Sequence, residues 1–119
     1  MKNFTKHCER EIVRKDHMQG GDGHILVESL INDEQKGPNS RMFSQVILEP
    51  GCEIGVHEHQ GESETYYILQ GEGTYTDNDE TYTVSAGDVT YCKNGTHGLK
   101  NTGNKDIVMV ALILTNLDK

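Results

Sequence analysis

Residues 51–71 read GCEIGVHEHQGESETYYILQG and place two histidines, His57 and His59, one residue apart. Successive side chains of a β-strand point to opposite faces, so histidines at positions i and i+2 share a face. A carboxylate, Glu64, follows after a short polar turn through Gly61. Imidazole nitrogens and carboxylate oxygens are donors that first-row divalent metals accept. The stretch therefore predicts two strands, joined by a turn, that hold a metal ion between them.

A second stretch punctuated by glycine, GDVTYCKNGTHGLKN at residues 87–101, supplies a fourth candidate ligand, His97. Three imidazoles and one carboxylate form a set that accepts Fe, Mn, Co, Ni, Cu or Zn, and the sequence does not choose among them. Four protein ligands leave two positions of an octahedral ion for water or for a chelating molecule. The plainer alternative is that both His-x-His residues are ordinary strand residues and that the glycines mark only turns.

Two other acidic residues compete with Glu64 for the place of the carboxylate ligand. Glu58 lies between the two histidines, so strand alternation should point it away from them. Glu62 lies two residues before Glu64 and is expected in the turn. Parity along the second strand therefore favours Glu64.

Composition limits the classes of protein to consider. With 119 residues the chain is long enough for one domain and one core. A net charge of −8 gives no basic surface for a phosphate backbone, so we expect neither a nucleic-acid partner nor an anionic membrane. Three widely spaced cysteines, with no CxxC pair, indicate reduced thiols. Without a hydrophobic signal region or a membrane-length apolar run, the protein is expected to be cytoplasmic.

Short apolar blocks between turn residues indicate an all-β sandwich or barrel. An edge strand is possible at 11–14, and a polar loop is expected at 32–40. The remaining strands are expected at 24–30, 42–48, 55–59, 64–69, 73–75, 81–84, 88–92, 98–100 and 107–114. The last of these, IVMVALIL, is apolar on both faces, so we expect another layer or a second subunit to cover its outer face.

The two glycine-punctuated stretches resemble the two motifs of the cupin superfamily. The first motif runs glycine, five residues, His-x-His, three or four residues, Glu, six residues, glycine, and this chain matches it at Gly51, His57, His59, Glu64 and Gly71. The second motif is matched at Gly87, Gly95, His97 and Asn101. It departs from the family in having Lys93 in place of proline and one residue fewer before His97. We place that missing residue in the 93–96 turn, because a shift inside a strand would reverse its faces.

The resemblance is to small single-domain bacterial members of the cupin-2 type, and it implies the fold and the site. The fold would be a jelly-roll barrel, or double-stranded β-helix, spanning residues 41–119, with residues 1–40 as an N-terminal extension carrying edge strands. The metal would be held by His57, His59, Glu64 and His97. A homodimer, built with help from the N-terminal strands, is also implied.

Several functions remain open at this point. The chain could be a metal-dependent dioxygenase, isomerase, decarboxylase or lyase acting on a small polar molecule, or a non-catalytic module that binds such a molecule. A structural dimer with a vestigial site is a third reading. Tyr66 shares the Glu64 face and either acts as an acid or simply packs. Lys93 and Lys100 either form a cationic rim for a carboxylate ligand or are solvated surface lysines.

Overall fold

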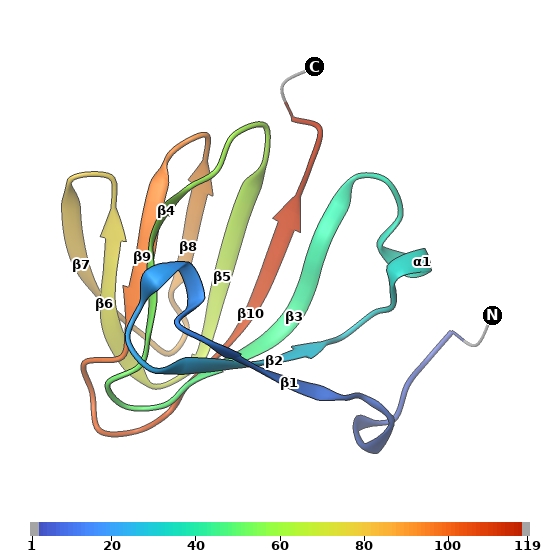
Figure 1. The fold of residues 1–119 in the computed structure, drawn as a ribbon, viewed down its shortest axis with the longest axis horizontal. Coiled ribbons are helices and arrows are strands. Elements are labelled where there is room, and N and C mark those ends of the chain that lie inside the picture. Colours follow the sequence, from blue (N-terminus) through green and yellow to red (C-terminus); the bar gives the residue numbers. More distant parts are fainter. Residues whose placement is uncertain (1–2, 118–119) are drawn as a thin grey trace.

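A computed structural model describes residues 3–117 as ten antiparallel strands in two sheets (Figure 1). The order is β1-β2-β3-β10-β5-β8 in the six-stranded sheet and β4-β9-β6-β7 in the four-stranded sheet. The strands are β1 (Ile12–Asp16), β2 (His24–Ser29), β3 (Ser40–Leu48), β4 (Glu53–Glu58), β5 (Ser63–Gln70), β6 (Glu72–Asp77), β7 (Glu80–Ser85), β8 (Val89–Lys93), β9 (Thr96–Lys100) and β10 (Ile107–Leu114). The predicted all-β jelly roll is confirmed.

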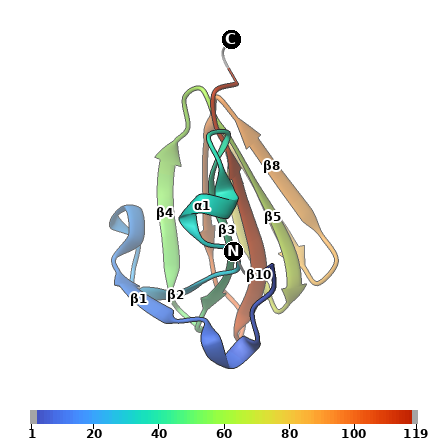
Figure 2. The same ribbon diagram turned by 90° about the vertical axis from the view of Figure 1, so that its right-hand side faces the viewer.

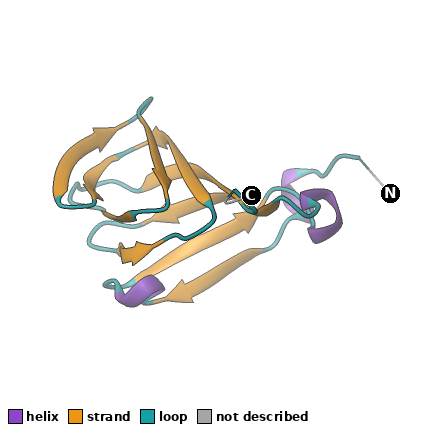
Figure 3. Ribbon diagram, turned by 90° about the horizontal axis from the view of Figure 1, so that it is seen from above, coloured by secondary structure: helices purple, strands orange, loops and turns teal. Residues whose placement is uncertain are grey.

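The core lies between the two sheets, which face each other in Figures 2 and 3. Strand β10 runs between β3 and β5, and its alternate residues Ile107, Met109 and Ala111 are almost fully buried. From β5, Tyr66 and Ile68 pair with Ala111 and Met109 and share their inward face. The four-stranded sheet contributes inward side chains such as Ile54, Tyr75 and Leu99. Period-two alternation thus places one face of each strand in the core.

The opposite face of β10 is only partly covered. Val108, Val110 and Leu112 are half-buried, and Leu114 is exposed. Within residues 3–117 no further layer covers this face fully, and its cover by a second subunit stays a prediction.

The N-terminal strands continue the six-stranded sheet. Strand β2 pairs with β3, with Val27 opposite Val46, and β1 pairs with β2 and forms the edge. Residues 12–29 therefore add two strands to the barrel's own sheet, and the turn between them is bonded to β4, where the Glu53 N–H donates to the Asp22 carbonyl at 2.9 Å. The edge strand runs Ile12–Asp16, slightly later than the expected 11–14.

A short helix, α1 (Asp33–Lys36), occupies part of the expected polar loop. It begins with a capping box, in which the Asn32 side chain accepts from the Gln35 backbone N–H and the Gln35 side chain accepts from the Asn32 backbone N–H. Two short 3₁₀ turns cover His7–Glu9 and Met18–Gly20. Within the described residues, no helix has the length and apolarity needed to cross a membrane.

Two turns at one end of the barrel are bonded together. The Gly61 N–H donates to Asn94 Oδ1 at 2.7 Å, and the His59 N–H donates to the Gly95 carbonyl at 2.9 Å. The Leu117 N–H donates to the Gly61 carbonyl at 3.0 Å. These bonds fix the β4–β5 turn against the β8–β9 turn, which are the two segments that carry the candidate ligands.

Candidate metal centre

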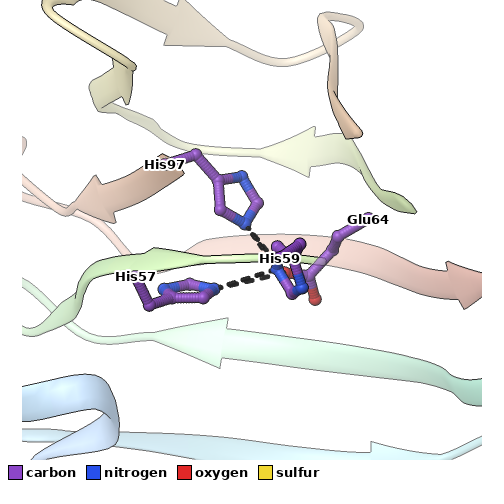
Figure 4. A group of neighbouring side chains, drawn as sticks. All are labelled: His57, His59, Glu64 and His97. Atoms are coloured by element: carbon purple, nitrogen blue, oxygen red, sulfur yellow. Dashed lines mark hydrogen bonds and ion pairs between the residues drawn. The ribbon is translucent and has the colours of Figure 1, made fainter. Parts of the chain in front are cut away.

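The four predicted ligands meet inside the barrel (Figure 4). His57 lies on β4 and pairs in register with His97 on β9, so both rings leave the same face of the four-stranded sheet. His59 follows the last residue of β4, and Glu64 comes from β5 of the opposite sheet. The cluster therefore bridges the two sheets. His59, Glu64 and His97 are buried, and His57 is partly exposed.

The ligand atoms are spaced like the corners of a coordination polyhedron. His59 Nε2 lies 3.1 Å from both His57 Nε2 and His97 Nε2. Glu64 Oε1 lies 3.0 Å from His59 Nε2 and 2.9 Å from His97 Nε2, but 3.6 Å from His57 Nε2. Donors at about 2.1 Å from one ion and at right angles to each other stand about 3.0 Å apart. The donor set and its spacing fit a single divalent ion.

Each imidazole is oriented by a partner on its other nitrogen. His57 Nδ1 lies 2.7 Å from the Gly55 carbonyl, and His59 Nδ1 lies 2.7 Å from Glu62 Oε1. His97 Nδ1 lies 2.8 Å from the Tyr75 hydroxyl. A carbonyl and a carboxylate accept the Nδ1 proton, and the hydroxyl can do so too. This leaves the Nε2 lone pairs pointing at one another and at Glu64. Such electron-rich atoms repel unless positive charge lies among them.

The acid–base properties of the cluster point the same way. Burial alone would raise the pKa of Glu64, but the neighbouring His57 and His97 rings hold that pKa far below its usual range. Burial would lower the pKa of His57, yet the nearby Glu64 carboxylate and the bond to the Gly55 carbonyl raise it. Burial lowers the pKa of His97 by more than the neighbouring Glu64 raises it, so the pKa is lowered. Glu64 is thus a carboxylate that needs a positive partner, and His97 favours the neutral form that binds metals.

Tyr66 contacts two members of the cluster, Glu64 and His97. Its hydroxyl donates to Glu64 Oε1 at 3.1 Å, and its ring stacks on His97 with centroids 5.1 Å apart. Burial, together with the neighbouring Glu64 charge, raises the pKa of Tyr66 well above that of a free phenol. The hydroxyl is therefore a proton-bearing donor at neutral pH. Its predicted role as an acid stays a prediction.

A cavity of about 120 Å³ opens beside the cluster and is lined by His57, His59, Glu64 and Tyr66. Two basic side chains, Lys15 from β1 and Arg41 from β3, also line it. Lys93 and Lys100, for which the sequence left both a cationic rim and a solvated surface open, do not line it. Lys93 is exposed on β8, and Lys100 Nζ lies 3.9 Å from Asp22 Oδ2. The cations beside the cluster thus come from β1 and β3 of the six-stranded sheet.

The sequence considered Glu62 only as a rival metal ligand, and it did not reveal the contacts of Glu62 or the place of Lys15 and Arg41 beside the cluster. Glu62 lies in the turn as expected, but its carboxylate accepts from His59 Nδ1 and from Arg41. The bond from Arg41 lowers the pKa of Glu62 the most, and the bond from His59 lowers it further, although burial opposes both. The only signal in the sequence was an acidic residue three positions after a candidate ligand. Glu58, between the two histidines, is exposed as predicted.

The sequence and structure resemble proteins that are already known. Residues 44–113 match the family model for the cupin domain. The chain is 39% identical over 102 residues to the oxalate-binding protein of Thermotoga maritima, covering 85% of this chain and 84% of the relative. The crystal structure of a predicted oxalate decarboxylase from Thermotoga maritima superposes with a TM-score of 0.88 at 37% identity, over 92% of this chain and 96% of that chain.

A more distant structure, KdgF from Halomonas sp., superposes with a TM-score of 0.73 at 20% identity, over 95% of this chain and 94% of that chain. At that identity the likeness shows the fold alone. The family match covers more than half of the residues and includes both segments that carry the His57, His59, Glu64 and His97 cluster. The chain belongs to the cupin family.

Proposed function

We propose that this protein binds one divalent transition metal through His57, His59, Glu64 and His97 and uses it to hold a small dicarboxylate of the oxalate type. The observation that carries the metal is the convergence of the three Nε2 atoms on Glu64 Oε1, with each Nδ1 already bonded elsewhere. Fe, Mn, Co, Ni, Cu and Zn all suit this donor set. The bound ion would supply a Lewis-acidic centre that attracts carboxylate oxygens.

The cavity supports a small anion as the ligand. Its volume of about 120 Å³ is well below the roughly 300 Å³ at which pockets for drug-sized ligands begin. Lys15 and Arg41 place positive charge on its wall, in a chain with a net charge of −8. Charge of that sign beside a metal favours a compact dianion. The relative named as an oxalate-binding protein supports the same class of ligand.

Binding is favoured over catalysis by the residues that line this cavity. Glu64 is the one carboxylate among them, and it belongs to the metal cluster. No second acid–base group of that kind faces the cavity from the described residues. Decarboxylation is the second candidate, supported by the relative described as a predicted oxalate decarboxylase. In that case Tyr66, which lines the cavity and donates to Glu64, is the candidate proton donor.

Two measurements test the proposal. Elemental analysis of protein purified without an affinity tag should give about one transition-metal ion per chain. Titration calorimetry should then show oxalate binding to the metal-loaded protein and none after chelator treatment. Formate or CO₂ release from oxalate would favour the enzyme instead. A metal-free protein that also fails to take up added metal would refute the proposal.

We also propose that a second copy of this chain covers the outer face of the six-stranded sheet. Register places Val110, Tyr67 and Val89 in one row across three strands, and the row beside it runs Leu112, Thr65 and Tyr91. Tyr67, Val89 and Tyr91 are between 47% and 62% exposed. A contiguous apolar surface of this kind is typical of subunit interfaces. Because the exposed apolar residues run across neighbouring strands, they favour a partner with a similar flat surface, such as the same sheet of a second copy.

Sedimentation equilibrium tests this dimer. The wild type should sediment as a dimer at micromolar concentration, and Tyr91→Arg should shift it toward the monomer. Tyr82→Arg, at a tyrosine of 49% exposure on the other sheet, is the matched control and should leave the dimer intact. A monomeric wild type would exclude the proposed interface.

A further inference from the structure

One carboxylate connects the metal cluster to the basic wall of the cavity. Glu62 Oε1 lies 2.7 Å from His59 Nδ1 and also 2.7 Å from the Arg41 Nη2 donor. Its second oxygen accepts from Arg41 Nε at 3.2 Å, so the Arg41–Glu62 pair is bidentate. A single side chain thus contacts both a predicted metal ligand and a cation that lines the cavity.

The backbone beside this carboxylate is fixed by bonds that do not involve His59 or Arg41. Glu62 follows Gly61, whose N–H and carbonyl are bonded to Asn94 and Leu117. The Glu62 side chain is 17% exposed and that of His59 is 4% exposed, so solvent screens their contact little. A carboxylate held in this way can orient a neighbouring ring. A carboxylate on the free end of a mobile loop could not.

Arg41 is differently placed. Its side chain is 57% exposed, and it lines the same cavity as His57, His59 and Glu64. Its Nε and Nη2 groups are taken up by Glu62, which sets the direction of the guanidinium plane. A freely moving arginine loses side-chain entropy when it binds an anion. Because the bidentate pair with Glu62 already restricts Arg41, less entropy remains to be lost on binding.

We propose that Glu62 is a positioning residue with two effects, fixing His59 for the metal and aiming Arg41 at the anion. The inference rests on the proposed function, since it assumes a metal at the cluster and an anion beside it. It adds that the two sites are coupled through one side chain. Loss of Glu62 should therefore weaken both kinds of binding, whereas loss of Arg41 should weaken only the second.

The first test measures metal affinity alone. Co²⁺ or Mn²⁺ is titrated into metal-free protein, and the visible spectrum of the Co²⁺ form reports its ligand geometry. Glu62→Ala should weaken metal binding by about tenfold to a hundredfold, as loss of a carboxylate behind a ligating histidine typically does. Glu62→Gln keeps an oxygen that accepts from His59 Nδ1 and should recover most of that loss. Glu58→Gln is the matched control, because it neutralises an exposed acid next to both histidines.

The second test measures oxalate affinity with metal present at saturation. Arg41→Gln should weaken oxalate binding about tenfold or more, the usual effect of losing a charge-assisted contact. Its metal affinity should stay within about threefold of the wild type. Glu62→Gln should resemble Arg41→Gln here, because it loses the ion pair that directs the guanidinium. Thermal midpoints of the metal-free variants establish that each has folded.

The outcomes separate this inference from the proposed function. If the wild type binds neither metal nor oxalate, the proposed function fails. If the wild type binds both and Glu62→Ala matches it in metal affinity, the positioning role is wrong while the function stands. Unchanged oxalate binding in Arg41→Gln overturns the part assigned to Arg41. Should Glu62→Ala not fold, Glu62→Ser, whose side chain is too short to reach His59 Nδ1, takes its place in the metal titration, and Arg41→Gln still decides the part assigned to the anion.

Discussion

Replacing His59 with alanine removes the ligand at the centre of the cluster. Its Nε2 is within 3.1 Å of His57 Nε2 and His97 Nε2, and 3.0 Å from Glu64 Oε1. We expect the variant to lose most of the stabilisation that a bound metal confers on the folded protein.

The size of that effect follows from ligand linkage. Metal at about a hundred times its dissociation constant stabilises the native state by about 2.7 kcal/mol. A domain of 119 residues has an unfolding entropy of about 0.25 kcal/mol/K, so Tm should rise by about 11 °C. Removal of a ligand should weaken binding by at least the roughly hundredfold that loss of an outer partner can cost. The same metal concentration would then contribute about 0.4 kcal/mol, or about 2 °C.

Thermal unfolding followed by circular dichroism measures both shifts, using chelator-treated protein with and without each candidate metal. His7→Ala is the control, since its side chain is 81% exposed outside the cluster, and it should keep the full shift. The reasoning is refuted if His59→Ala rises as far as the wild type. It is also refuted if no first-row metal raises the Tm of the wild type.

Three further predictions follow. Metal affinity should fall as the pH is lowered, because a protonated His57 ring cannot bind the metal. The fall should begin above pH 6.5, the ordinary imidazole pKa, since the pKa of His57 is raised. Metal titrations at several pH values measure this, and an affinity that does not change with pH would contradict it. Met109→Ala, at a fully buried position, should lower the free energy of unfolding in urea by about 2–5 kcal/mol, whereas Thr83→Ala at an exposed site should change it little. Gly71→Ala should cost more than about 1 kcal/mol in the same assay, since Gly71 has φ +95° and a Cβ would lie 2.5 Å from the Asp106 carbonyl oxygen. Unfolding midpoints equal to the wild type would contradict either stability prediction.

Most of the fold could be predicted from local pattern. Strand β10 follows from its apolar run, and β4 and β5 follow from alternation on either side of the Gly61 turn. The helix α1 was missed because no apolar stripe marks so short an element. The pair Asn32 and Gln35 did carry its capping-box signature.

The ligands could be predicted, but their surroundings could not. His57 and Glu64 are recognised by spacing along single strands, which the sequence records directly. The contact of Glu62 with Arg41 joins residues 21 positions apart. Lys15 reaches the cavity because β1 pairs with β2 in a register that places it opposite Ile25. The local pattern of apolar and polar residues does not predict which strand will be the partner or in which register the two strands will pair.

The bonds on the three Nδ1 atoms have a consequence for the metal-free protein. A site whose rings are already held by a carbonyl, a carboxylate and a hydroxyl is assembled when the chain folds, without waiting for an ion. In zinc fingers, by contrast, the cation itself drives folding, and stripping it unfolds the chain. Here a chelator should leave a folded barrel that takes up the ion again without rebuilding its interior. The ion such a receptor carries in the cell would then depend on which metal the cell supplies.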